Sequence, residues 1–507
     1  MIELWKHQQD AVRFAVYREA SYLAMAMGTG KTLVALTLLK HWEARNVLVL
    51  CPTSVLGVWR REAARWTPWY QVVAPTRPPV AMKAREIAES RSDGFRIVVV
   101  NYESAWRKPL DALLLKDKWD AVILDEAHRI KGHNTKVSKF CAMLAEQAKR
   151  RLCLSGTPMT QGPLDLFGQF RFLNPTIFGT SWYRFLNRYA IRDNPMIPQM
   201  VTKYQNMAEL KAKFHANAFQ VGSEVLTLPP ALTIDIPIDL SGKAAYVYGQ
   251  MEREFVAEVA GGVVTAANTL VKTLRLRQIC SGYLAVQEVE TLDGEPDELL
   301  VTVHEGKRDA LTDLLSGLDE PVVVFAEFLN DLDTVSEVCE QLGLRYGELS
   351  GRRKDGLDAN AQMSGDIDVL GTQYQSGSLG VDLTRSAAVI YYSPTFSLSG
   401  YEQSVARLVR PGQTRPVRMW RLIIKDTIDE KVWGALDRKR DVIDEVLSSY
   451  TKGVANESDR PPNEVREAAR RNPGGGEEAQ RPEGRKVESR EFSGRDDAIH
   501  WSELDAD

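Results

Sequence analysis

The chain is 507 residues long, which is too long for one compact domain, so two or three domains are expected. Hydrophobic residues make up 44% of it and charged residues 26%, as in soluble globular proteins. No apolar run approaches the length of a membrane span, and the first residues lack the apolar segment of a signal peptide. These features argue against a membrane-spanning protein and against a secreted one.

The formal net charge of −4 does not by itself indicate a nucleic-acid partner. Residues 451–507 contain 10 of the 64 Lys and Arg and 14 of the 68 Asp and Glu, which leaves 54 of each in residues 1–450. Because the body is neutral, any DNA site must be a local basic groove. The five cysteines are scattered without a C-x-x-C pair, which indicates a reducing compartment and argues against disulfides and a zinc site.

The first part of the chain alternates apolar runs with helical patterns. Residues 1–20 predict an amphipathic helix. The apolar run at 22–26 leads through the glycine-containing residues 27–32 into a helical pattern at 33–39. Further strands are predicted at residues 47–51, 96–100, 121–124 and 151–154. Repeated strand–helix units predict a parallel sheet that is covered on both faces.

The pattern changes after residue 175. Residues 176–300 contain helices and one alternating strand at 232–238, which predicts a helical insertion or hinge between two sheet domains. Strands and helices alternate again over residues 301–425, with strands at 322–325, 367–370, 388–392 and 418–423. Residues 426–450 predict one helix. The tail 451–507 is rich in Pro, Gly, Glu and Arg and predicts disorder.

Residues 27–32, Met-Gly-Thr-Gly-Lys-Thr, have the setting of a phosphate-binding loop. Glycines let backbone N–H groups turn towards an anion, and the following helix adds the positive end of its dipole. Lys31 would reach the β- and γ-phosphates, and the Thr32 hydroxyl would hold Mg²⁺. Because Met25 stands where the full pattern has a glycine, the match is partial, and an ordinary strand-to-helix turn is the alternative.

Residues 125–128, Asp-Glu-Ala-His, end an apolar strand. The carboxyl end of such a strand lies at the ligand-binding edge of an open α/β sheet. Asp125 would bind the Mg²⁺ that Thr32 holds, and Glu126 would orient or activate the attacking water. Acidic residues at a helix N-terminus are the alternative, which the upstream loop makes less attractive.

Over residues 4–433 the motifs resemble, in type and order, the Swi/Snf-type ATPases and DNA translocases of helicase superfamily 2, in a minimal phage- or bacterial-like form. Residues 4–8 resemble the adenine-recognising start, and residues 51–56 with 101–103 resemble DNA-contacting motifs. Residues 129–131 match the basic continuation of the acidic box. Residues 154–158 resemble the motif that couples the lobes, and residues 276–280 are a phrase common in this family.

The second half continues the resemblance. Residues 376–384 resemble a glycine-rich motif that contacts DNA and nucleotide, and residues 403–413 resemble the arginine-finger motif. By that match Arg407 and Arg410 would meet the γ-phosphate, which suits the bidentate guanidinium group. An arginine pair on a solvated helix is the alternative.

The resemblance implies an α/β fold of two RecA-like parallel-sheet lobes, with a helical insertion between them and a C-terminal brace helix. The implied ranges are an ATP-binding lobe at 1–175, the insertion at 176–300, the second lobe at 301–425 and the brace helix at 426–450. The implied ligands are ATP, Mg²⁺ and DNA. The implied setting is the cytoplasm of a prokaryotic or phage-infected cell.

The resemblance also implies a set of site residues. The catalytic residues would be Lys31, Asp125, Glu126, Arg407 and Arg410. Nucleotide would be bound by Gln8, Met27, Gly28, Thr29, Gly30, Lys31, Thr32, Gly380 and Asp382, and the metal by Thr32 and Asp125. DNA would be contacted by Thr53, Ser54, Trp59, Lys131, Ser376 and Thr384. Coupling would involve Ser155, Gly156, Thr157 and Gln403.

Several DNA contacts have plain structural alternatives. Thr53 and Ser54 could cap the following helix, and Trp59 could belong to the core. Three departures from the family pattern also stand out: Met25-Ala26 replace an acidic pair, Ser378 replaces a glycine, and residues 219–222 lack the usual basic residues. None removes a catalytic group.

The sequence therefore predicts a DNA-dependent ATPase that translocates on duplex DNA by contacts to phosphates rather than bases. A strand-separating helicase and a DNA-binding scaffold with a vestigial ATPase are the two rival interpretations.

Overall fold

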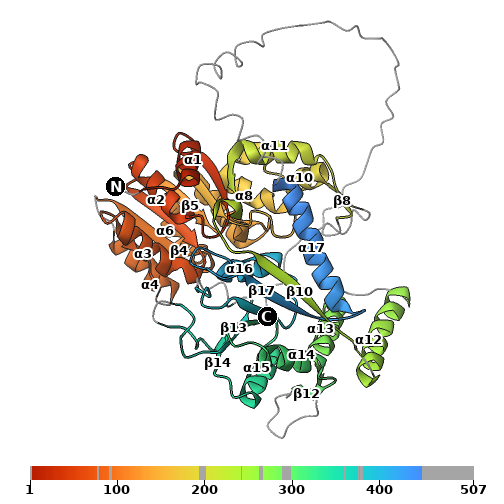
Figure 1. Cartoon of the computed structure of the whole chain (residues 1–507). Coiled ribbons are helices and arrows are strands. Elements are labelled where there is room, and N and C mark those ends of the chain that lie inside the picture. The colour runs from red at the N-terminus through yellow and green to blue at the C-terminus, as the bar shows by residue number, and fades with distance from the viewer. Residues whose placement is uncertain are drawn as a thin grey trace, which may run out of the picture. The chain divides into compact units, whose positions relative to one another are not determined.

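The computed structural model describes residues 3–76, 79–90, 94–192, 201–240, 242–261, 266–287, 298–358, 361–374, 376 and 381–447. Gly380 and the tail 451–507, which was expected to be disordered, lie outside the described residues. Two parallel sheets organise the described chain, as predicted for two α/β lobes (Figure 1).

The first sheet has seven strands, all paired in parallel, in the order β3-β4-β2-β5-β6-β1-β9. Its strands are β1 (Ala20–Met25), β2 (Asn46–Cys51), β3 (Gln71–Val73), β4 (Arg96–Asn101), β5 (Trp119–Asp125), β6 (Ala148–Ser155) and β9 (Ala218–Val221). Five predicted strands are thus confirmed, while β3 and β9 are too short for a sequence pattern to indicate them. Parallel pairing brings the carboxyl ends of these strands to one edge of the sheet.

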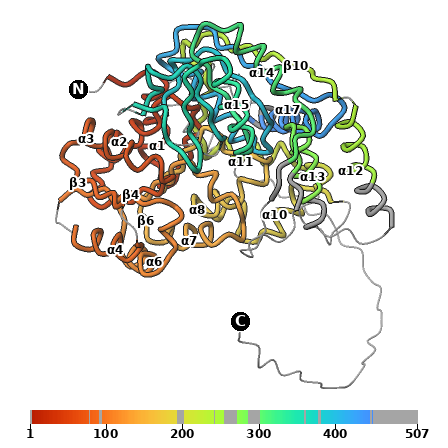
Figure 2. The backbone as a smooth tube through the Cα atoms, turned by 90° about the horizontal axis from the view of Figure 1, so that it is seen from below, coloured from red at the N-terminus to blue at the C-terminus, as the bar shows by residue number. Residues whose placement is uncertain are grey.

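Both faces of the first sheet are buried, which explains the continuous apolar runs. In β5, Ile123 packs on one face and Leu124 on the other. One face is covered by α1 (Lys6–Ala15), α2 (Lys31–His41) and α3 (Leu56–Trp66). The other is covered by α4 (Val80–Glu89), α6 (Leu110–Lys116), α7 (Lys136–Ala145) and α8 (Leu166–Leu173), and Figure 2 shows the two helical layers on either side of the strands.

The second sheet has six parallel strands in the order β10-β17-β16-β13-β15-β14. They are β10 (Ala231–Ile238), β13 (Val322–Ala326), β14 (Tyr346–Leu349), β15 (Val369–Gln373), β16 (Ala388–Tyr391) and β17 (Val417–Ile424). The sequence does not indicate β14, because Glu348 interrupts its apolar character. The structure buries Glu348 completely and pairs it with Arg352 at 2.8 Å.

Four helices cover the second sheet. On one face lie α14 (Gly306–Ser316) and α15 (Leu329–Gln341), and on the other lie α16 (Leu398–Leu408) and α17 (Ile428–Leu447). At the start of α17, Asp429 forms an ion pair of 2.6 Å with Lys307 of α14, and each side chain is only 1% exposed. Helix α17 also contacts α13 (Ala266–Ser281) and α11 (Met207–Asn217) (Figure 1).

The range 176–300 is not simply the predicted helical insertion, because it completes both sheets. Its strand β9 pairs with β1 in the first sheet, and β10 pairs with β17 in the second. The range also holds α10 (Trp182–Tyr189), α11, α12 (Gly242–Gly261), α13 and the hairpin of β11 (Tyr283–Gln287) and β12 (Glu298–Thr302). An alternating pattern indicates that a strand forms, but its partner depends on the folded sheet. In the part of the chain that the structure describes, no helix is long and apolar enough to cross a membrane.

Candidate active site

The phosphate-type loop connects β1 to α2 at the carboxyl edge of the first sheet. Gly28 and Gly30 have φ angles of +81° and +83°, in the left-handed region that side chains rarely adopt. A Cβ at Gly30 would collide with the Gln8 side chain, and a Cβ at Gly28 would lie 2.8 Å from Pro411 Cδ. Both glycines are therefore required by backbone conformation and by close neighbours.

Gln8 binds the backbone of this loop. It is only 4% exposed, its Nε2 donates to the Thr29 carbonyl at 3.0 Å, and its Oε1 accepts from the Trp5 N–H. His7 Nε2 also lies 3.0 Å from the Thr29 carbonyl. The structure therefore brings the predicted nucleotide residue Gln8 to the loop, where its amide fixes the backbone between the two glycines.

Helix α2 begins directly after the loop. Gly30 is its N-cap and offers no side chain, so no side-chain cap accepts from the N–H groups of the first turn. Lys31 Nζ donates to the carbonyls of Met25 and Ala26, at 2.9 and 3.3 Å. Thr32 stands beside Lys31 in the same turn. Free N–H groups, a lysine and a hydroxyl are the donor set that a phosphate with Mg²⁺ requires.

Two carboxylate side chains, those of Asp125 and Glu126, lie at the carboxyl end of β5, at the same edge of the first sheet. Asp125 is 6% exposed, and its Oδ2 accepts a hydrogen bond of 2.8 Å from Trp59 Nε1. Its backbone carbonyl accepts from the Tyr102 hydroxyl at 2.8 Å. Glu126 has a φ of +53°, a strained conformation for a residue with a Cβ, which turns its side chain away from the line of the strand.

The two carboxyl groups titrate differently. Burial, reinforced by the charge of Glu126, raises the pKa of Asp125, although the Trp59 hydrogen bond and Lys31 oppose this. Burial also acts to raise the pKa of Glu126. His128, Lys31 and Arg407 outweigh it and bring that pKa below its ordinary value. The pKa of Glu126 therefore lies below that of Asp125.

Residues 155–157 join the acidic box to the loop. Ser155 Oγ lies 3.1 Å from His128 Nδ1 and 3.5 Å from Glu126 Oε2, and it accepts from the Thr157 N–H. A Cβ at Gly156 would lie 3.3 Å from the Met27 nitrogen, so this segment packs directly on the loop. The three predicted coupling residues in the first half therefore lie together at the site.

The second half contributes Arg407 from the last turn of α16. Burial, with the neighbouring charge of Arg410, lowers its pKa to about 10, and the carboxylates of Glu126 and Asp382 act against this shift. Arg407 therefore remains a cation at neutral pH and interacts with Glu126 across some 280 positions of sequence. Asp382 is itself fixed because it accepts from the Thr384 N–H and hydroxyl, at 2.9 and 2.7 Å.

Other predicted residues are placed differently. Gln403 Nε2 donates to Ser399 Oγ within α16, at 3.3 Å, and its coupling role stays a prediction. Arg410 precedes Pro411, which contacts the loop at Gly28. Ser376 is half-buried. The Thr384 hydroxyl donates a hydrogen bond to Asp382, and the role of Thr384 as a DNA contact stays a prediction.

The prediction that Trp59 contacts DNA is wrong. Its side chain is completely buried in the core of the first lobe, and its Nε1 is bound to Asp125. An indole is apolar enough for a core and keeps one donor for a buried partner. The role of Trp59 in orienting Asp125 could not be read from the sequence, because 66 positions separate the two residues.

Two of the first-lobe residues expected at DNA, Thr53 and Lys131, each lie beside a different acidic residue. Glu103 accepts from Arg129 at 3.0 Å and from the Thr53 hydroxyl at 3.5 Å. Lys131 Nζ is bound to the Thr160 hydroxyl and lies 3.8 Å from the Asp165 carboxylate. Burial lowers the pKa of Lys131, and the positive charge of Lys439 adds to this. Glu103 and Asp165 thus orient the basic residues, and sequence reasoning assigned neither this role.

Among the described residues, no group of three or more His, Cys, Asp or Glu is placed to hold a metal. Asp125 and Thr32, the two residues predicted to hold Mg²⁺, lie at the carboxyl end of β5 and in the first turn of α2.

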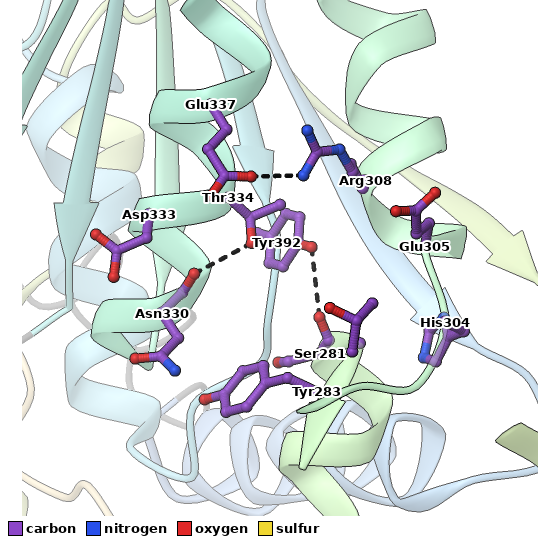
Figure 3. Close-up of a pocket in the computed structure, with 12 residues that line it drawn as sticks. Ser281, Tyr283, His304, Glu305, Arg308, Asn330, Asp333, Thr334, Glu337 and Tyr392 are labelled. Atoms are coloured by element: carbon purple, nitrogen blue, oxygen red, sulfur yellow. Dashed lines mark hydrogen bonds and ion pairs between the residues drawn. The ribbon is translucent and has the colours of Figure 1, made fainter. Parts of the chain in front are cut away.

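A cavity of about 200 Å³ lies away from these residues, in the second lobe (Figure 3). It is lined by α14, α15 and the segment that joins α13 to β11, with Glu305, Asn330 and Tyr392 among its residues. Arg308 and Glu337 form an ion pair of 2.6 Å across its rim. None of the predicted site residues lines it.

Two family models match the chain. The SNF2-related domain matches residues 7–283, more than half of the chain, and the helicase conserved C-terminal domain matches residues 306–412. The chain therefore belongs to the SNF2-related family of helicase-like proteins. The chain passes from the first sheet to the second between β9 and β10, within the range of the first match.

Curated relatives agree. The mouse SWI/SNF-related matrix-associated actin-dependent regulator of chromatin subfamily A member 1 is 28% identical over 446 residues, covering 81% of this chain and 40% of that protein. The zebrafish chromodomain-helicase-DNA-binding protein 1-like is 27% identical over 471 residues, covering 88% and 44%. This chain thus spans less than half the length of either relative. A solved structure, the Sulfolobus solfataricus SWI2/SNF2 ATPase core with dsDNA, aligns at 21% identity and a TM-score of 0.40, covering 89% and 94%.

Proposed function

We propose that this chain is a DNA-dependent ATP hydrolase that couples hydrolysis to translocation on double-stranded DNA and so remodels DNA or protein–DNA complexes. The observation that carries the proposal is the approach of the second lobe to the nucleotide loop of the first. A Cβ at Gly28 would lie 2.8 Å from Pro411 Cδ, four residues after Arg407, and the charge of Arg407 helps to lower the pKa of Glu126. A site split in this way links hydrolysis to the relative position of the lobes, as a motor requires.

In this proposal ATP lies along the carboxyl edge of the first sheet, with its base near Gln8 and its phosphates in the loop of Gly28 and Gly30. Lys31 neutralises the phosphates, and the open N-terminus of α2 donates its N–H groups. Mg²⁺ held by Thr32 and Asp125 would supply charge neutralisation of the phosphate oxygens. No further metal ligand from the protein is needed.

Glu126 and Arg407 would act on the transferred phosphoryl group. Glu126 stays ionised, because His128 and Lys31 lower its pKa, so it can accept a hydrogen bond from the attacking water. Arg407 stays charged and can stabilise the negative charge that develops in the transition state. Its neighbour Arg410 is proposed to assist at the same phosphate.

DNA is proposed to contact Thr53, Ser54, Lys131, Ser376 and Thr384 through its backbone phosphates. The names of relatives support a DNA partner, since one of them is a helicase and DNA-binding protein and another is a regulator of chromatin. A location in the cytoplasm of a prokaryotic or phage-infected cell stays a prediction for this protein.

The test compares the rate of ATP hydrolysis without nucleic acid and with duplex DNA, single-stranded DNA or RNA. We expect duplex DNA to give the largest stimulation. Lys31→Ala should lower hydrolysis by at least about a hundredfold, because it removes a charge at the phosphates, while DNA binding is retained. Lys40→Ala, at an exposed lysine of the same helix, is the matched control and should hydrolyse ATP like the wild type.

Movement along DNA is tested separately. Displacement of a triplex-forming strand without unwinding of a forked duplex supports translocation, and unwinding of the fork would instead identify a strand-separating helicase. Absence of hydrolysis in the wild type with every nucleic acid would leave the scaffold with a vestigial ATPase as the better description.

A further inference from the structure

Gln169, in the middle of α8, is a completely buried polar residue whose amide is fully bound. Its Oε1 accepts from the Tyr22 hydroxyl at 2.6 Å. Its Nε2 donates to the carbonyls of Pro158 and Asp165, at 2.7 and 2.8 Å. Burying an amide costs free energy unless every group is bound, and a leucine of similar size would fill the space without that cost.

The surroundings of this amide are apolar. The ring of Tyr22 lies 6.2 Å from that of Phe170 and 5.8 Å from that of Phe214. Hydrogen bonds are electrostatically stronger in such an environment, and an unpaired partner is more costly. The geometry of the bound amide is therefore tightly determined.

Gln169 joins two segments that belong to the nucleotide site. Tyr22 lies on β1, three residues before the strand ends and the loop begins. Pro158 ends the segment 155–158, whose Gly156 packs on the loop at Met27 and whose Ser155 contacts His128 and Glu126. A shift of either segment is transmitted to the other through one rigid amide.

Asp165, the third partner of Gln169, connects it to Lys131, a predicted DNA contact. Asp165 gives its carbonyl to Gln169 and uses its carboxylate to accept from the N–H groups of Thr160 and Gln161, both at 2.7 Å, and from the Thr160 hydroxyl. The Thr160 hydroxyl in turn accepts from Lys131 Nζ, which lies 3.8 Å from the Asp165 carboxylate.

We propose that Gln169 is a positioning residue that couples the nucleotide loop to the DNA-facing side of the first lobe. The route runs from Tyr22 and residues 155–158 on one side to Asp165, Thr160 and Lys131 on the other. Gln169 touches neither ATP nor DNA, so it acts by holding these segments in register. This inference rests on the proposed function, because it concerns the dependence of hydrolysis on DNA.

The test substitutes Gln169→Leu, which keeps the volume but leaves the Tyr22 hydroxyl and the Pro158 carbonyl without their partner. Nucleotide affinity, the basal hydrolysis rate and the rate with saturating duplex DNA are measured on the full chain. We expect affinity and basal rate to stay within about twofold and the stimulation by DNA to fall about tenfold, the size of effect expected for a coupling contact.

Two further variants separate coupling from stability. Tyr22→Phe should also lower the stimulation by DNA, but by a smaller factor. The double variant Tyr22→Phe, Gln169→Leu should keep as much stimulation as Gln169→Leu alone, because the two substitutions remove the same interaction. Leu173→Ala, at a fully buried leucine of the same helix, is the matched control: its Tm should fall while its stimulation by DNA stays that of the wild type.

The inference is overturned if Gln169→Leu keeps the wild-type stimulation, or if it lowers the basal and stimulated rates by the same factor. It is equally overturned if Leu173→Ala, when its Tm equals that of Gln169→Leu, loses the stimulation by DNA to the same extent as Gln169→Leu. A wild-type protein whose hydrolysis DNA does not stimulate would instead contradict the proposed function itself, and the two failures are thus told apart.

Discussion

Asp125 is oriented by two aromatic residues from outside its own strand. Trp59 Nε1 donates to its carboxylate, and the Tyr102 hydroxyl donates to its backbone carbonyl. The indole hydrogen bond opposes the effect of burial and favours the ionised carboxylate. This hydrogen bond matters for the proposed role of Asp125 as a Mg²⁺ ligand, because burial favours the protonated acid.

Trp59→Phe should impair hydrolysis, because phenylalanine fills most of the space but cannot donate to the Asp125 carboxylate. Losing one hydrogen bond to a charged group costs roughly 1.5–3 kcal/mol, which corresponds to roughly a tenfold to hundredfold lower kcat. The measurement is kcat as a function of Mg²⁺ concentration. Trp66→Phe is the control, because that indole, on the same helix, donates to Glu62 away from the site; an equal loss in both variants would contradict the assigned role.

Asp331 provides a prediction of pH dependence. It is 1% exposed, and its pKa is raised to about 6 because burial outweighs the Ser393 hydrogen bond and the charge of Lys307. An unfolded aspartate titrates at about 3.9, so the unfolded state gives up its proton first as pH rises. The stability of the folded form therefore falls between about pH 4 and pH 6 and stays lower above that range.

Asp331→Asn should raise the free energy of unfolding by up to about 3 kcal/mol at pH 7.5, and by little near pH 4. Urea unfolding of the second lobe at several pH values measures this. Asp333→Asn, at an exposed neighbour that pairs with Arg352, should change stability by less than about 1 kcal/mol at every pH. A pH-independent effect of Asp331→Asn would show that ionisation is not its cause.

At the scale of elements, α8 sets the position of the chain that follows the acidic box. Gly168 faces the short helix η2 (Ala127–Ile130), and a Cβ there would collide with the Ile130 carbonyl and lie 3.0 Å from that of Lys131. Only glycine lets the helix approach this backbone, and the approach brings Lys131 to Thr160 and Asp165.

Gly168→Ala should destabilise the first lobe by roughly 1–3 kcal/mol, because the backbone of one element has to move. Gly434→Ala on α17 is the matched control: the nearest atom to its Cβ is a mobile guanidinium nitrogen of Arg438 at 3.3 Å. That substitution should stabilise by roughly 0.5–1 kcal/mol through helix propensity alone. Thermal unfolding distinguishes the two, and equal shifts of Tm would refute the close-approach argument.

At the scale of the molecule, the candidate site exists only when both lobes contribute. Arg407 belongs to the second lobe, and Glu126, Lys31 and Asp125 belong to the first. Both side chains are half-buried, and the positive charge of Arg407 helps to lower the pKa of Glu126.

Arg407→Ala should therefore leave ATP affinity within a few-fold of the wild type and lower DNA-stimulated hydrolysis by roughly a thousandfold or more. Nucleotide binding and single-turnover hydrolysis measure the two effects on one preparation. Arg438→Ala, at an exposed arginine of α17, should retain activity. Hydrolysis by Arg407→Ala at a tenth of the wild-type rate or faster would contradict its assignment.

The sequence determined the elements and the order of the motifs, because both are local. Continuous apolar runs predict buried parallel strands, and the runs at 47–51, 96–100, 121–124 and 151–154 all became strands of one sheet. Residues 27–32 and 125–128 were identified by type and spacing, and the structure brings them to one edge. The family match over residues 7–283 includes both segments.

Only the tertiary structure decided which residues meet. Strand β10 joins the sheet of the second lobe, Trp59 turns inward to Asp125, Gln169 binds Tyr22, and Pro411 packs on Gly28. Each of these contacts joins residues at least 66 positions apart. Such contacts depend on the packing of whole elements against one another, for which a periodic pattern along the chain carries no information.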